Sequence, residues 1–126
     1  MLRPTARTSV LLALSAGMVG TAQAAPLNPG DYTSLAASLA PTTDLVVDTD
    51  ALTITGDASL CGGSGTCTGV LDGGIAVFTF DDVDLSSVNV VATGSAPLAI
   101  LSKGDLDVGG TIDVSAVDEI PGPGGA

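Results

Sequence analysis

The side chains that could carry chemistry in this sequence are almost all carboxylates. The 126 residues include 14 aspartates and glutamates and three lysines and arginines, and they include no histidine. Two carboxylates on either side of a glycosidic bond are enough to hydrolyse it, so paired aspartates could form a sugar-cleaving site. The candidates are Asp81, Asp82, Asp84, Asp105, Asp107 and Asp113. All six also fit the polar face or the turns of β-strands, and we therefore expect a protein that is not an enzyme.

The composition excludes other kinds of active site. A Ser-His-Asp or Cys-His site needs a histidine, which the chain lacks. Lys103 is the only basic residue after Arg7, so side-chain cations for phosphate or oxyanion binding are nearly absent. No GxGxxG, Walker or HExxH motif occurs. We expect no catalytic, cofactor-binding or metal-binding residues.

Calcium is the one ion that the aspartates could attract. Asp48 and Asp50 lie two residues apart at the corner between two apolar runs, and calcium prefers such oxygen ligands. A calcium loop needs more ligands and a glycine turn in register, so a polar turn is the preferred interpretation. A calcium-dependent binding module stays open as an alternative.

Cys61 and Cys67 are the only cysteines, and they enclose a glycine-rich loop. In an exported chain, a lone pair at this spacing predicts a disulfide. The spacing is too wide for a thioredoxin-like redox pair, and two thiols without histidine make a poor zinc site. Free or metal-binding thiols are the alternative.

The elements that position these side chains are predicted to be strands. Between Leu98 and Ser115 six apolar residues occupy even positions and five polar residues occupy odd ones, which is typical of strands with one buried face. The apolar residues are Leu98, Ile100, Leu106, Val108, Ile112 and Val114, and the polar ones are Asp105, Asp107, Thr111, Asp113 and Ser115. A hairpin at Gly109–Gly110 would place each apolar residue opposite a polar one. An arc into a strand stacked in parallel would keep the apolar residues in one interior, and we favour the arc. The last strands should then leave an unpaired edge that could pair with more chain or with itself.

Strands joined by arcs predict an all-β fold, an irregular right-handed parallel β-helix (solenoid) of three or four coils. A β-sandwich is the alternative. We assign residues 1–24 to a signal peptide, 25–43 to a leader or N-terminal cap, 44–117 to the β-solenoid and 118–126 to a Pro/Gly-rich tail. Within the cap, Asp31 is predicted to begin a short helix that runs to Ala40.

The first 24 residues resemble a secretion signal. Arg3 and Arg7 precede a short apolar run, and Ala22-Gln23-Ala24 fits the small-x-small cleavage pattern, which predicts a cut before Ala25. We therefore expect export by the general secretory route to the periplasm, the cell surface or the medium. The remaining chain is strongly acidic, which excludes nucleic acid and anionic membrane surfaces as partners.

A signal peptide followed by VNVVATGSAPLAILSKGDLDVGGTIDVSA and a Pro/Gly-rich tail resembles the amino-terminal part of large exported bacterial proteins. Filamentous-haemagglutinin-like proteins and autotransporter passengers have this form, and the run from Pro97 to Ala116 carries most of the resemblance. The resemblance implies a non-catalytic structural or adhesin-like protein, and a fragment of a longer chain. Its partners would be surface polysaccharide or its own downstream coils. The alternative is the N-terminal part of a carbohydrate-active β-helix enzyme.

Overall fold

The structure, a computed structural model, describes residues 26–116 and 122–124, and these residues form an all-β fold with two short helical turns. The helical turns are η1 (Pro29–Asp31) and α1 (Leu60–Gly63). The strands are β1 (Ser38–Leu39), β2 (Leu45–Asp48), β3 (Thr53–Thr55), β4 (Cys67–Thr68), β5 (Val70–Asp72), β6 (Ile75–Phe80), β7 (Asp82–Leu85), β8 (Val90–Thr93), β9 (Leu98–Ser102), β10 (Leu106–Val108) and β11 (Ile112–Asp113).

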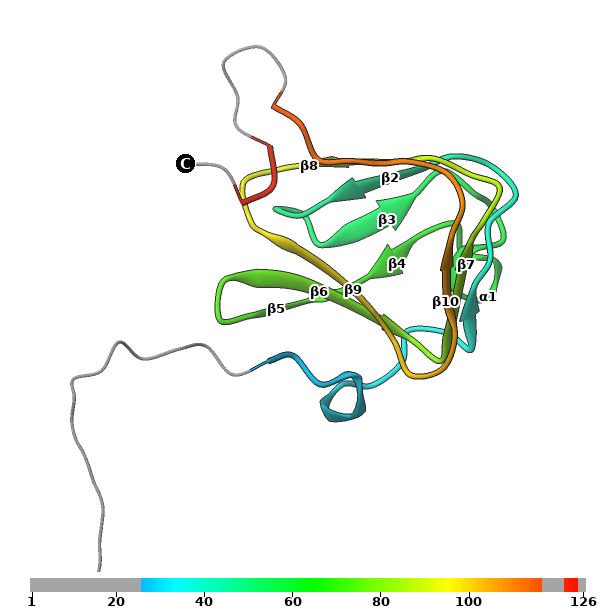
Figure 1. The fold of residues 1–126 in the computed structure, drawn as a ribbon, viewed down its shortest axis with the longest axis horizontal. Helices are drawn as coiled ribbons and strands as arrows, with labels where there is room; N and C mark the ends of the chain where they lie inside the picture. Colours follow the sequence, from blue (N-terminus) through cyan, green and yellow to red (C-terminus); the bar gives the residue numbers. More distant parts are fainter. Residues whose placement is uncertain (1–25, 117–121, 125–126) are drawn as a thin grey trace, which may run out of the picture.

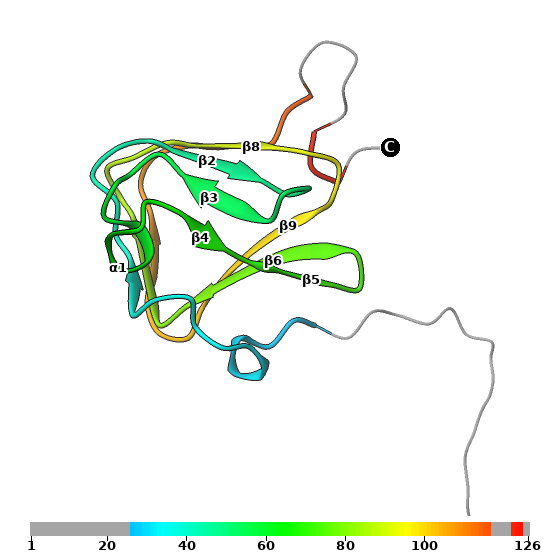
Figure 2. The ribbon, with the colours of Figure 1, turned by 180° about the vertical axis from the view of Figure 1, so that it is seen from behind.

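The strands form three small sheets around one core. Sheet A has the order β1-β7-β10, sheet B the order β11-β8-β2-β3-β4, and sheet C the order β5-β6-β9. In Figure 1, sheets B and C face each other as two layers and sheet A closes one side between them. Figure 2 shows the same arrangement from behind.

The arc predicted at Gly109–Gly110 is confirmed. β10 pairs in parallel with β7 in sheet A, and β11 pairs in parallel with β8 in sheet B. The two strands on either side of the glycine pair therefore belong to different sheets and do not form a hairpin. Gly109 and Gly110 each donate an N–H group to the Leu85 carbonyl oxygen, at 3.2 and 3.4 Å, at this corner.

The predicted parallel β-helix of three or four coils is wrong. In the described residues β2 pairs with β3, β3 with β4 and β5 with β6 in antiparallel fashion, so the middle of the chain does not stack as parallel coils. Gly73 and Gly74, with φ of +59° and +84°, provide the tight turn that reverses the chain between β5 and β6. The two facing layers are compatible with the β-sandwich alternative.

The helix predicted from Asp31 to Ala40 is also wrong. The chain has only the η1 turn at the start of this segment and then extends into β1, which pairs with β7. The N–H of Leu35 donates to the Thr79 carbonyl oxygen at 2.8 Å, and the N–H of Asp82 donates to that of Ala37 at 3.1 Å. Pairing with the sheet replaces the hydrogen bonds that a local helix would make, and tertiary contacts of this kind regularly outweigh helix propensity.

The core lies between the three sheets and consists of aliphatic side chains and two phenylalanines. Phe78 and Phe80 of β6 are fully buried at its centre. The other large buried side chains are Leu39, Leu45, Val47, Ile54, Leu60, Val83, Leu85, Val88 and Val90. The alternation of buried and exposed residues in β2, β7 and β8 follows the pattern of one wet and one buried face.

The predicted signal peptide lies outside the described residues. Within residues 26–116 and 122–124, none of the helical segments has the length and hydrophobicity that crossing a bilayer requires.

Candidate functional site: structural carboxylates and an open apolar end

The structure brings four of the six candidate aspartates together on the outer face of sheet A. Asp84 of β7 lies in register with Asp107 of β10. Asp82 lies beside Asp105, and its Oδ1 accepts a hydrogen bond from the Asp105 N–H at 3.0 Å. All four side chains are exposed. Asp113 lies apart from them, in β11 of sheet B.

Four of the six candidate carboxylates, those of Asp81, Asp82, Asp84 and Asp113, accept hydrogen bonds from turns and loops. Asp84 accepts from the Ser86 N–H at 3.0 Å, and Asp81 accepts from the Ser34 hydroxyl at 2.5 Å. Asp113 accepts from both the N–H and the hydroxyl of Ser115, at 2.9 and 2.6 Å. These contacts hold strand ends and loops together, which is a structural use of the side chains.

Hydrogen bonding shifts two of these carboxyls away from the behaviour of a general acid. The Ser86 hydroxyl, and then its N–H, lower the pKa of Asp84 below its ordinary value. Ser115 has the same effect on the pKa of Asp113. A carboxyl that protonates a leaving group needs a raised pKa, so the environment of these two residues acts in the opposite direction.

Asp48 and Asp50, the predicted calcium candidates, bond to different partners. Asp48 Oδ1 accepts the N–H groups of Asp50 and Ala51, both at 2.9 Å, and closes the turn after β2. Asp50 Oδ1 accepts the N–H and hydroxyl of Ser95 at 3.0 and 2.8 Å, and these bonds lower its pKa. Across the described ranges, no group of three or more His, Cys, Asp or Glu side chains is arranged to hold a metal ion.

Asp57, which the sequence interpretation did not single out, makes the most hydrogen bonds of this kind. Its side chain is only 8% exposed, and it accepts the Thr42 N–H and the Ser59 N–H, both at 2.8 Å. The Ser59 hydroxyl donates to it at 2.6 Å, and the Thr43 N–H at 3.3 Å. The Ser59 hydroxyl, the Ser59 N–H and then the Thr42 N–H lower the pKa of Asp57 far below its ordinary value.

Part of the Asp57 site has a sequence signal. Asp-Ala-Ser is a pattern in which the aspartate bonds to the backbone two residues on, as it does with Ser59. Thr42 and Thr43 lie 15 and 14 residues before it in the chain, and only the folded structure brings them to the carboxylate. Asp57 therefore holds the segment before β2 against the loop that precedes α1.

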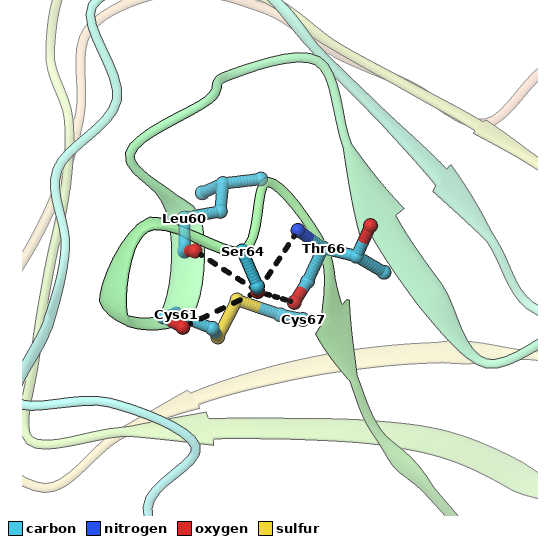
Figure 3. Close-up of a disulfide and its surroundings, with 5 residues drawn as sticks. All are labelled: Leu60, Cys61, Ser64, Thr66 and Cys67. Atoms are coloured by element: carbon cyan, nitrogen blue, oxygen red, sulfur yellow. Dashed lines mark hydrogen bonds between the residues drawn. A yellow bond between two sulfur atoms is a disulfide. The ribbon is translucent and has the colours of Figure 1, made fainter.

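The predicted Cys61–Cys67 disulfide is confirmed, with the two Cα atoms 5.4 Å apart. Figure 3 shows Ser64 inside the closed loop, where its hydroxyl lies 2.9 Å from the Thr66 carbonyl oxygen and 3.3 Å from that of Leu60. Leu60 and Cys67 are both buried in the core. The disulfide loop is therefore attached to the core at both of its ends.

The second candidate site is the end of the fold where β9, β10 and β11 lie, which we call the open end. Each of these strands lies at one edge of its sheet. Leu106, Val108, Ile112 and Val114 share one face, as the alternation predicted, and they are 57%, 45%, 38% and 46% exposed. With Leu85, Pro97, Leu98, Ile100 and Pro123 they line an apolar cavity of about 380 Å³. The predicted unpaired edge is present in the described residues.

Comparisons of the chain with protein-family models, with curated proteins and with solved structures found no match. The resemblance to filamentous-haemagglutinin-like proteins and autotransporter passengers therefore stays a prediction.

Proposed function

We propose that the protein is a non-catalytic structural, adhesin-like protein that is secreted or displayed at the cell surface. The observation that carries this proposal is the use of the carboxylates. Asp50, Asp57, Asp84 and Asp113 accept hydrogen bonds from turns and loops, and their pKa values are lowered. Side chains engaged in this way support a scaffold, and their environment does not favour acid catalysis.

The disulfide supports the extracellular part of the proposal. Disulfides form and persist in oxidising compartments and are rare in the cytosol. The Cys61–Cys67 bond closes a short loop at the edge of sheet B. Together with the predicted signal peptide, it favours export to the periplasm, the cell surface or the medium.

Export is tested by expressing the full chain in a bacterium and measuring the intact mass of the protein outside the cytoplasm. We expect a chain that begins at Ala25, with both cysteines resistant to alkylation until they are reduced. A matched variant, Ala24→Phe, should block cleavage because the pattern needs a small residue there. An uncleaved wild-type chain that remains in the cytoplasm would contradict the proposal.

The proposal that the protein is not an enzyme is tested on a panel of bacterial and plant surface polysaccharides. Binding is measured by co-sedimentation, and hydrolysis by the release of reducing sugar. We expect no hydrolysis from the wild type, and the same binding from Asp84→Asn and Asp107→Asn as from the wild type. Hydrolysis that either substitution abolishes would show that the carboxylates of sheet A form an active site, and the enzyme alternative would then replace this proposal.

A further inference from the structure

The outer edge of β10 has main-chain groups that point away from its sheet. In the described residues β10 pairs only with β7. The Val83 N–H donates to the Asp105 carbonyl oxygen at 3.0 Å, and the Gly109 N–H donates to that of Leu85 at 3.2 Å. Successive residues of a parallel strand direct their main-chain groups to opposite edges. The N–H and C=O groups of Leu106 and Val108 are therefore directed to the edge beside which the described residues place no strand.

The same edge is apolar on its inner side. Leu106 and Val108 are 57% and 45% exposed, and both line the cavity of the open end. Pro123 of the described tail lines the same cavity, but the main-chain bond of this tail is to the loop before β9, where the Gly124 N–H donates to the Ser95 carbonyl oxygen at 3.2 Å. An added strand on β10 would thus find both main-chain partners and an apolar surface.

The outer side of this edge carries the charge that selects the occupant. Asp107 lies in register with Asp84, and like charges placed directly beside each other on adjacent strands are destabilising. A strand added to β10 would place an outward side chain next to Asp107. A second copy of this chain would bring a further acidic surface, because the net charge of the chain is −11. A lysine or arginine at that position would instead neutralise the pair.

We propose that the outer edge of β10 binds an extended segment of a partner protein in which apolar residues alternate with lysine or arginine. The main chain of the segment bonds to Leu106 and Val108, as in strand addition to other sheet edges. Its apolar side chains cover the cavity of the open end, and its cations lie beside Asp107. This surface does not depend on the proposed structural role or on where the protein is located.

Two labelled synthetic peptides of the same length test the proposal by fluorescence anisotropy with the purified full chain. In one peptide valine alternates with lysine, and in the other valine alternates with glutamate. We expect the basic peptide to bind roughly tenfold or more tightly than the acidic one at low ionic strength, with a smaller difference at high salt. Equal binding of the two peptides, or no binding of the basic one, would overturn the proposal.

Two variants locate the binding at β10. Asp107→Lys should reverse the preference between the peptides, whereas Asp31→Lys, which changes the net charge equally but lies on η1, should leave it unchanged. Val108→Pro removes an N–H group from the open edge without removing a bond to β7. It should weaken binding of the basic peptide by roughly tenfold or more, while the β-type circular dichroism spectrum persists.

The charge variants keep the test valid if Val108→Pro fails to fold. An equal effect of Asp107→Lys and Asp31→Lys would show attraction to the acidic chain as a whole and would overturn the proposal. Light scattering on the protein without peptide measures whether the chain is a monomer or a dimer. A dimer that the basic peptide cannot dissociate would show that a second copy occupies the edge.

Discussion

Among single residues, Asp57 shows most clearly how this acidic chain uses its carboxylates. Its side chain is buried but receives hydrogen bonds from two segments of the chain that are far apart in sequence. A buried carboxylate is tolerated when donors of this kind surround it. The result is a connection between the entry to β2 and the loop that carries the disulfide.

Replacement of Asp57 by asparagine should destabilise the fold. The amide keeps the shape but has one acceptor oxygen, and its NH₂ group would face the N–H donors of Thr42 and Ser59. We expect the melting temperature to fall by roughly 5–10 °C in Asp57→Asn. Asp31→Asn on the exposed η1 turn is the control, and thermal unfolding followed by circular dichroism measures both. Equal shifts in the two variants would contradict the role assigned to Asp57.

The lowered pKa of Asp57 predicts a dependence on pH. The pKa of Asp57 is lower in the folded chain than in the unfolded one. Its contribution to the stability of the fold is therefore complete when the pH is above the ordinary aspartate pKa, and it is lost as the pH falls through the pKa of the folded state. The melting temperatures of the wild type and Asp57→Asn should therefore differ by a constant amount between about pH 5 and pH 8 and converge below about pH 4. A difference that grows in acid would contradict this sign.

The functional candidates of the sequence were only partly located by residue type and spacing. Asp81, Asp82 and Asp84 were identified as turn or surface residues, and the structure places them there. Asp57 was missed because two of its partners, Thr42 and Thr43, are brought to it by tertiary structure. Spacing in sequence indicates bonds within one turn, but it does not indicate bonds between separate loops.

At the scale of elements, the corner between β10 and β11 depends on close approach of two main chains. A Cβ atom on Gly110 would overlap the Val88 carbonyl oxygen, and one on Gly109 would overlap that of Ser86. Glycine is therefore required at this corner because there is no space for a side chain. The neighbouring bond from the Val90 N–H to the Thr111 carbonyl oxygen, at 2.8 Å, connects β11 to β8.

Gly110→Ala should detach β11 from β8. We expect hydrogen exchange of the Val90 N–H to become at least roughly tenfold faster, because its acceptor on Thr111 moves away. Gly30→Ala is the control, since a Cβ atom there would meet only the side chain of Asn28, at 3.3 Å. Unchanged protection of Val90 in Gly110→Ala would show that the corner does not depend on this approach.

The disulfide should stabilise the fold by restricting the unfolded chain. For so short a loop the expected contribution is about 2 kcal/mol in the free energy of unfolding. Chemical denaturation of the wild type with and without reductant measures it. The double variant Cys61→Ala, Cys67→Ala should match the reduced wild type and should not respond to reductant. A double variant as stable as the oxidised protein would contradict this contribution.

The sequence pattern predicted individual strands better than their arrangement. Strict alternation from Leu98 to Ser115 indicated β9, β10 and β11 and the face that they share. The prediction of stacked coils extended this pattern to the middle of the chain, where the turn at Gly73–Gly74 instead forms an antiparallel pair. The predicted helix near Asp31 failed because that segment pairs with β6 and β7, a contact that local propensity does not report.

At the scale of the whole molecule, the excess of carboxylates produces charge repulsion across the fold. The net charge is −11, and Lys103 is the only basic side chain in the described residues. Self-repulsion of this kind destabilises a compact state and is screened by salt. We expect the melting temperature to rise by roughly a few degrees when sodium chloride is raised from about 20 mM to about 500 mM. A fall over this range would show that attractive ion pairs outweigh the repulsion.

Asp48, Asp50, Asp57, Asp84 and Asp113 act as structural hydrogen-bond acceptors in this protein. The most direct test is thermal unfolding of the purified chain by circular dichroism, in excess calcium and in excess chelator. An ion that bound the native aspartates would raise the melting temperature, and the rise would increase with its affinity and its concentration. Our account predicts one cooperative β-type transition at the same temperature in both conditions. A transition that calcium raises by several degrees would contradict it and would make the carboxylates a cation site.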